Sequence, residues 1–157
     1  MSTAALVRIE GIERVNRLMA RLAGVADRSD MLERAAAMVE SQTRRRISDE
    51  KASPDGTPWA PWSDGYAATR HGGQSLLQAE GYLMDIMTYS IGLGAHAAYV
   101  GSNMIYAAIQ QHGGTAQMAP GPAAVPARPY LGISDENLGD IEADLAAWAD
   151  DLLETFQ

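Results

Sequence analysis

The chain has 157 residues, no cysteine and a formal net charge of −8. This length suits one domain with its own core and is short for two, while the absence of cysteine excludes disulfides and thiolate metal sites and is typical of a reducing cytoplasm. No segment is long and apolar enough for a membrane span, and no basic region precedes a long apolar run, so neither a membrane contact nor a signal peptide is expected.

The charge is unevenly distributed along the chain. Residues 1–51 carry ten Arg and Lys against eight Asp and Glu, whereas residues 135–157 carry eight acidic residues and no basic one. A dedicated nucleic-acid reader normally shows a basic stripe, so this pattern argues against one. An acidic surface is nevertheless what a conduit needs if DNA is to slide past it without sticking.

The N-terminal part predicts one strand and two helices. Residues 4–9 form a short strand candidate, and apolar residues recur at helical spacing from Gly11 to Leu22. A second helix is predicted from about Asp30 to Ser48, because a capping-box pattern precedes an apolar stripe. Three arginines, Arg44, Arg45 and Arg46, stand at its C-terminal end, where the helix dipole favours basic side chains. A solvated face and a contact with a partner or phosphate are both open for them.

Residues 51–63 predict an ordered loop without regular structure. Pro54, Asp55 and Gly56 form a turn signal, and three prolines prevent a helix or strand. Trp59 and Trp62 lie in the same loop. Two indoles are costly to leave in water, so at least one is expected to pack on the domain or on a neighbour.

The C-terminal half predicts a hairpin and two helices. A turn or short helix at residues 76–83 leads into a β-hairpin made by residues 84–93 and 96–101. A short helix over 106–112 ends at two glycines, and a flexible loop follows at about 113–127. Ser134 is a good N-cap for a last amphipathic helix, whose C-terminal end holds acidic residues where the dipole disfavours them. This end either frays or meets a basic partner. The expected class is α+β: a small antiparallel sheet, two N-terminal helices, a short middle helix and a C-terminal amphipathic helix.

Arg128 stands between Pro126 and Pro129. Each proline restricts the residue before it to extended geometry, so Arg128 is expected to be extended. A guanidinium held in this way suits a carboxylate, a phosphate or a row of carbonyl oxygens. An edge strand with a solvated arginine is the alternative.

The sequence contains no recognisable catalytic or metal-binding motif. His71, His96 and His112 are far apart and none has a ligand-spaced neighbour. There is no phosphate loop, dinucleotide fingerprint or nucleophile elbow. No catalytic residue, cofactor or metal is therefore assigned.

Five motifs occur in an order that resembles the tailed-phage virion morphogenesis proteins, of the Mu G-like or P2-type tail completion kind. They are residues 54–63, 77–83, 99–102, 106–114 and 126–132. The chain departs from the usual family pattern at Ala79-Glu80-Gly81, where a threonine commonly precedes the glycine, and at Tyr130, where phenylalanine is frequent. Neither departure changes the expected fold.

The resemblance implies a non-enzymatic neck or tail-completion subunit that forms a ring at the head-tail junction of the virion, made in the host cytoplasm. Its partners would be copies of itself, other phage neck, connector and tail-tube proteins, and DNA that passes through the lumen without sequence-specific binding. A tail terminator and a head-closure subunit are the alternatives within this class. A metal-dependent hydrolase and a monomeric host adaptor are alternatives from other classes.

Eight residues are the candidate interface of such a ring. In the expected contact, the arginines of the second helix face the acidic last helix of a neighbour, and Arg128 orders the 113–124 loop or pairs across the subunit boundary. The set is Arg44, Arg45, Arg46, Gln110, Gln111, His112, Arg128 and Tyr130. Pro54, Gly56, Trp59 and Trp62 are expected to shape the proline loop.

Overall fold

The structure is a computed structural model and describes residues 5–8, 20, 28–85, 87–92, 97–114 and 125–155. The predicted helix over 11–22, apart from Ala20, and most of the predicted 113–127 loop lie outside these residues. His96 lies outside them as well.

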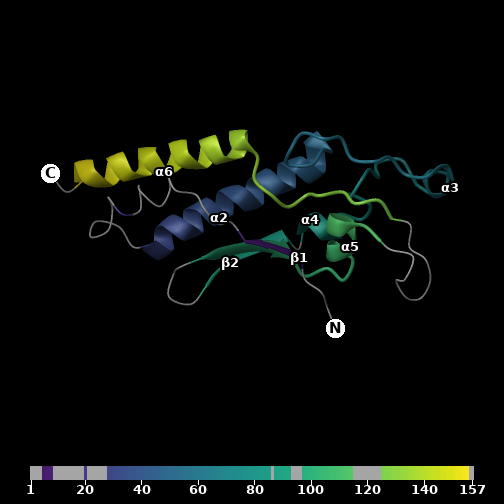
Figure 1. Ribbon diagram of the computed structural model, residues 1–157, viewed down its shortest axis with the longest axis horizontal. Coiled ribbons are helices and arrows are strands. Elements are labelled where there is room, and N and C mark those ends of the chain that lie inside the picture. Colours follow the sequence, from purple (N-terminus) through teal and green to yellow (C-terminus); the bar gives the residue numbers. More distant parts are fainter. Residues whose placement is uncertain are drawn as a thin grey trace.

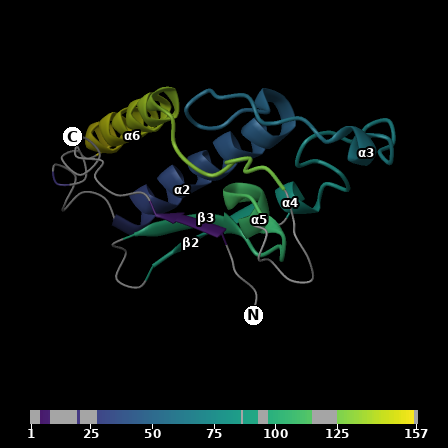
Figure 2. The same cartoon turned by 45° about the vertical axis from the view of Figure 1, so that its right-hand side comes forward.

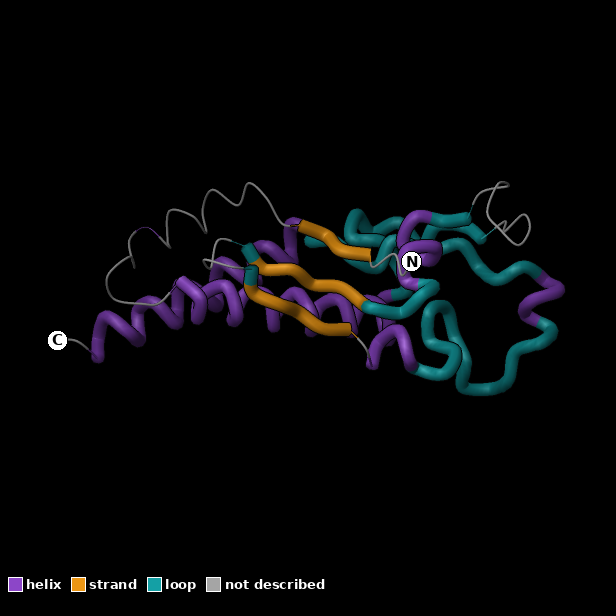
Figure 3. Tube along the Cα trace, turned by 90° about the horizontal axis from the view of Figure 1, so that it is seen from below, coloured by secondary structure: helices purple, strands orange, loops and turns teal. Residues whose placement is uncertain are grey.

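Three antiparallel strands form one sheet. Strands β1 (Ala5–Arg8), β2 (Met87–Ile91) and β3 (Ala98–Ser102) follow the order β1-β3-β2, so β3 is central. In the register, Val100 of β3 faces Val7 of β1 on one side and Tyr89 of β2 on the other. Figure 3 shows the three strands side by side. The predicted hairpin and the predicted N-terminal strand are confirmed.

Two long helices form the other two layers. Helix α2 (Arg28–Arg45) continues as a π-helical turn, η1 (Arg46–Glu50), and ends where Lys51 adopts a left-handed conformation with φ of 52°. Helix α6 (Asp135–Thr155) begins at Ser134, whose hydroxyl accepts a hydrogen bond from the backbone N–H of Asn137 at 3.1 Å. The predicted second helix and the predicted cap of the last helix are confirmed.

Helix α2 lies between the sheet and α6 (Figures 1 and 2). The end of α2 meets the start of α6, because the amide of Gln42 donates to the carbonyl oxygen of Asn137 at 3.1 Å. Near the other end, Arg34 pairs with Asp144. The two helices are therefore antiparallel, and α2 buries side chains on both of its flanks.

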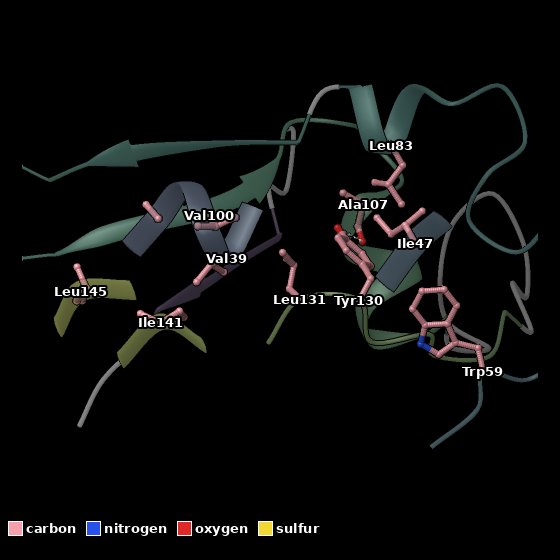
Figure 4. Packing of buried hydrophobic residues seen from close by; sticks show 11 residues of the cluster. Val39, Ile47, Trp59, Leu83, Val100, Ala107, Tyr130, Leu131, Ile141 and Leu145 are labelled. Carbon is pink, nitrogen blue, oxygen red and sulfur yellow. Dashed lines mark hydrogen bonds between the residues drawn. The ribbon is translucent and has the colours of Figure 1, made fainter. Parts of the chain in front are cut away.

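The core follows α2 from one end to the other. Figure 4 shows Val39 and Val100 near Ile141 and Leu145 of α6, while Ile47 and Tyr130 lie farther along. Further buried residues of the second part are Trp59, Leu83, Ala107 and Leu131. Each large apolar side chain removed from water contributes about 1.5–3 kcal/mol, so this line of contacts holds the three layers together.

Three short helices of the described chain lie in the half of the molecule away from the C-terminus of α6 (Figure 1). They are α3 (Asp64–Ala67), α4 (Tyr82–Asp85) and α5 (Ala107–His112). Helix α5 confirms the predicted middle helix, and it ends at Gly113, where φ is 81°. Figure 1 shows α3 at the end of the long axis opposite the C-terminus of α6. The predicted α+β class with an antiparallel sheet is confirmed.

Candidate functional site

The segment 125–132 runs extended between α5 and the proline loop. Its backbone N–H groups bond to α5: that of Arg128 donates to the carbonyl oxygen of Gln110 at 2.7 Å, and those of Tyr130 and Leu131 donate to the side-chain oxygen of Gln111 at 3.0 Å each. The amide nitrogen of Gln111 donates to the carbonyl oxygen of Leu131 at 3.2 Å. One glutamine side chain thus replaces a neighbouring strand for this segment.

Arg128 joins the same segment to the proline loop. Its Nε donates to the carbonyl oxygen of Ala60 at 2.9 Å and its Nη2 to that of Pro61 at 3.1 Å. Its side chain is 6% exposed, and burial lowers the pKa of the guanidinium, with a smaller opposing effect of Tyr66. Of the partners expected for an extended arginine, the structure selects carbonyl oxygens. Arg128 therefore has an internal role.

Arg46 holds the segment from its other side. Its Nη1 donates to the carbonyl oxygens of Tyr130 at 2.9 Å and Gly132 at 3.1 Å, and its Nη2 donates to the side chain of Asn137 at 2.6 Å. Glu50 lies 3.7 Å from its Nε. Burial lowers the pKa of Arg46, and Glu50 opposes that shift. The guanidinium is 1% exposed and is part of the core.

The other two arginines of the triplet differ from Arg46. Arg44 pairs with Glu40 at 2.9 Å, and Arg45 pairs with Glu50 at 2.8 Å, both on the surface of the same chain. Pairing between the basic helix and the acidic last helix is also found within one chain, since Arg34 binds Asp144. The contact of Arg44, Arg45 and Arg46 with the last helix of a neighbouring copy stays a prediction.

Four of the eight candidate interface residues are inside the chain. Arg46, Gln111, Arg128 and Tyr130 are each at most 9% exposed. The hydroxyl of Tyr130 donates to the carbonyl oxygen of Ala107 at 3.3 Å, and burial raises its pKa. Contacts within the chain therefore bury these four side chains, and their part in a subunit interface stays a prediction.

The remaining candidates lie at or near the surface. His112 is exposed at the end of α5 and Gln110 is half-buried. Arg44 is half-buried and Arg45 is exposed. These four stay candidate interface residues.

The proline loop is packed as predicted. Trp59 is 5% exposed, and its indole N–H donates to the carbonyl oxygen of Pro129 at 3.0 Å. Gly56 has φ of 83°, which suits glycine in the turn. Pro54 packs against Gly132, so closely that a Cβ built there would lie 2.6 Å from the Pro54 Cγ.

Two internal anchors were not predicted. The Nζ of Lys51 donates to the side chains of Ser75 at 2.8 Å and Gln78 at 3.2 Å, and also bonds the carbonyl oxygens of Ile47 and Leu76. Asn137, 3% exposed, receives the bond from Arg46. The burial of Asn137 could have been predicted from its position beside the apolar stripe of α6.

A pocket of about 470 Å³ opens beside Arg128. Four aromatic side chains are part of its wall. Two of them, Trp62 and Tyr66, meet edge to face at 5.8 Å between ring centroids. The guanidinium carbon of Arg70 lies 4.3 Å from the centre of the Tyr66 ring. The side-chain oxygen of Gln110, on the same wall, is buried and has no hydrogen-bond partner among the described residues. The principal lining residues are Trp62, Tyr66, Leu77, Tyr82, Tyr106 and Arg128.

This chemistry suits recognition of another molecule. Aromatic walls with a few polar groups bind ligands or side chains, and pockets of roughly 300–1,000 Å³ are usual for that purpose. Within the described ranges, no group of three or more His, Asp or Glu side chains is placed to hold a metal ion. His71 and His112 are exposed. A search of the described helices finds none that is both long and apolar enough to cross a membrane.

Comparison with known proteins agrees with the resemblance drawn from the sequence motifs. The phage virion morphogenesis family matches residues 8–150. The chain is 40% identical over 115 residues to "Putative capsid assembly protein G" of Escherichia phage Mu, and the match covers 70% of this chain and 72% of that protein. No solved structure matches. The chain belongs to the phage virion morphogenesis family.

Proposed function

We propose that this chain is a structural subunit of the neck or tail-completion type, which forms a ring at the head-tail junction of the virion and lets DNA pass through its centre. Family membership supports a role in building the virion. The name of the Mu relative refers to capsid assembly, which fits a subunit at the place where head and tail join.

The observation that carries the ring is the difference between the two ends of the molecule. The pocket lies at the end that holds α3 and α4, and the acidic end of α6 lies at the opposite end of the long axis (Figure 1). Two unlike ends on one elongated subunit favour head-to-tail contacts, which close into a ring when the rotation between neighbours is right. A two-fold dimer would need one self-complementary surface instead.

The charge supports a DNA conduit. Each subunit has a net charge of −8, so a ring of subunits repels the phosphate backbone of DNA. At physiological salt this repulsion extends over about 8–10 Å, the screening length. Weak contact is an advantage for a channel, since DNA must move through it. The proposed partners are other copies of the chain and the connector and tail-tube proteins on either side.

Gene deletion in the phage that encodes the chain tests this proposal. We expect finished heads and finished tails that fail to join, with joining restored when the purified chain is added to the extract. Tails of irregular length would point to a tail terminator, and heads that lose their DNA would point to a head-closure subunit. Normal particles from the deletion, or particles in which mass spectrometry finds no copy of the chain, would overturn the virion role.

A further inference from the structure

Arg128 is a buried cation without a carboxylate partner among the described residues. Both of its side-chain hydrogen bonds go to main-chain carbonyl oxygens, whereas the other buried arginine, Arg46, has Glu50 at 3.7 Å. Removing a cation from water is costly unless an opposite charge compensates it. Arg128 also lines the pocket, so a carboxylate that enters the pocket can reach it. The one acidic residue among the described lining residues, Glu80, accepts a hydrogen bond from Gln74.

Exposed aromatic side chains at the rim of the pocket can also contact an apolar side chain. Tyr66 is 47% exposed and Tyr82 is 56% exposed, which is high for large aromatic residues. Together with Trp62 and Tyr106 they surround the cavity. Aromatic residues at a pocket mouth are the usual anchors of protein interfaces. The best fit is therefore a segment that offers one carboxylate and one aliphatic side chain close together.

The last turns of α6 offer this combination. Asp150, Leu153 and Glu154 are spaced by three and four residues, so they share one face of the helix. All three are exposed, Leu153 to 39%. The last turn contains no basic residue, so its negative charges oppose the helix dipole without compensation there. Asp151, on a different face, is within electrostatic reach of Arg34 and is not needed for the contact.

We propose that the pocket receives the C-terminal turns of α6 from a second copy of the chain. Leu153 packs among the aromatic side chains, and a carboxylate of the same face meets the guanidinium of Arg128. Figure 1 shows α3, whose Tyr66 lines the pocket, and the C-terminus of α6 at opposite ends of the long axis, so one chain cannot make this contact with itself. The contact is heterologous, and it rests on the proposed ring function by giving that ring its subunit interface.

Reversing the charges at the C-terminal end of α6 tests this contact without destabilising the fold. Lysines at positions 150 and 154 would improve the helix dipole, so the variant Asp150→Lys/Glu154→Lys is expected to fold at least as well as the wild type. We expect its self-association at low salt, measured by sedimentation velocity, to weaken at least tenfold. The control Asp140→Lys/Glu136→Lys changes charge equally on exposed residues of the first half of α6. It removes two charges that attract Arg45, so its folding is checked by thermal unfolding, and the folded control is expected to retain association. Unchanged association of the first variant, or a wild-type chain that stays monomeric at low salt, would overturn the contact.

The pocket side has its own matched pair of variants. Tyr82→Ala removes a rim side chain, whereas Ile105→Ala removes one that is 79% exposed and does not line the pocket. We expect only Tyr82→Ala to weaken association, again at least tenfold. Association that is equally sensitive to both variants, or to neither, would overturn the assigned site.

Photo-crosslinking in full-length protein identifies the occupant. A photoreactive phenylalanine at position 82, in a mixture of isotopically light and heavy copies, is expected to give mixed crosslinks to residues 150–157. Crosslinks to another region of a second copy, or in virions to a different protein, would overturn the proposed occupant. The head-tail role would survive that result, because the deletion and rescue experiment tests it separately.

Discussion

The guanidinium of Arg46 donates a hydrogen bond of 2.6 Å to the side-chain oxygen of Asn137 and so fixes the end of α2 to the start of α6. The same guanidinium binds two carbonyl oxygens of the extended segment. Helix α2, helix α6 and the proline-flanked segment therefore meet at one buried side chain. The stability of this end of the molecule depends on it.

Arg46→Ala is expected to destabilise the chain by about 3–5 kcal/mol, because it leaves a cavity and unpaired polar groups. Arg44→Ala removes a partly exposed pair with Glu40 and is expected to cost about 0.5 kcal/mol. Urea unfolding of both variants measures the difference. Similar midpoints for the two would mean that the Arg46 guanidinium is not buried in solution.

The difference within this triplet shows what the sequence could and could not predict. Helical spacing predicted α2 and its apolar stripe, and Arg46 stands seven residues after Val39 and three after Thr43, on that same stripe. The helical position of Arg46 could therefore be predicted. Nothing in the local sequence, however, distinguished it as the buried member of three consecutive arginines. Arg46 differs from the other two because it binds the segment 130–132, which comes more than 80 residues later in the sequence. Helical periodicity carries no information about such a contact.

The role of Arg128 was predictable only in part. Flanking prolines correctly predicted extended backbone, and carbonyl oxygens were among the partners considered. The choice among partners depends on the proline loop at Ala60 and Pro61, which no local pattern places beside it. The pocket was not predictable either, because its lining combines four separate stretches of the chain.

Gln111→Leu is expected to destabilise the chain by about 3 kcal/mol, because three backbone groups of residues 130 and 131 lose their partner. Amide hydrogen exchange of Tyr130 and Leu131 should become faster. Gln110→Leu is the control, since no residue in the described part of the chain donates a hydrogen bond to the buried side-chain oxygen of Gln110. Equal protection of the two amides in both variants would argue against the glutamine bridge.

The Arg34 pair makes a small pH-dependent contribution. A hydrogen bond from Arg34 lowers the pKa of the Asp144 carboxyl, and burial opposes this shift. The contribution is therefore fully present above about pH 4, the unfolded value, and is lost as the pH falls through the lowered folded pKa. Both side chains are about a third exposed or more, so we expect about 0.5 kcal/mol. In urea unfolding, Asp144→Asn should have a lower free energy of unfolding than the wild type at pH 7 and the same one near pH 2. A difference in stability that persists at acid pH would show that the ionised Asp144 carboxylate is not its cause.

Gly132→Ala is expected to destabilise the chain for two reasons that act at the same place. The glycine has φ of 144°, which side chains rarely adopt, and an added Cβ would lie 2.6 Å from the Pro54 Cγ. The proline loop would have to move away from the extended segment, at a cost of about 1–3 kcal/mol. Gly139→Ala is the matched control: apart from its own helical turn, no described atom lies within 4 Å of its added Cβ, and the position is exposed in the interior of α6. There alanine should stabilise the helix by about 0.5–1 kcal/mol. Thermal unfolding of the two variants should therefore shift in opposite directions, and a shift in the same direction would show that the contact between Pro54 and Gly132 does not constrain the loop.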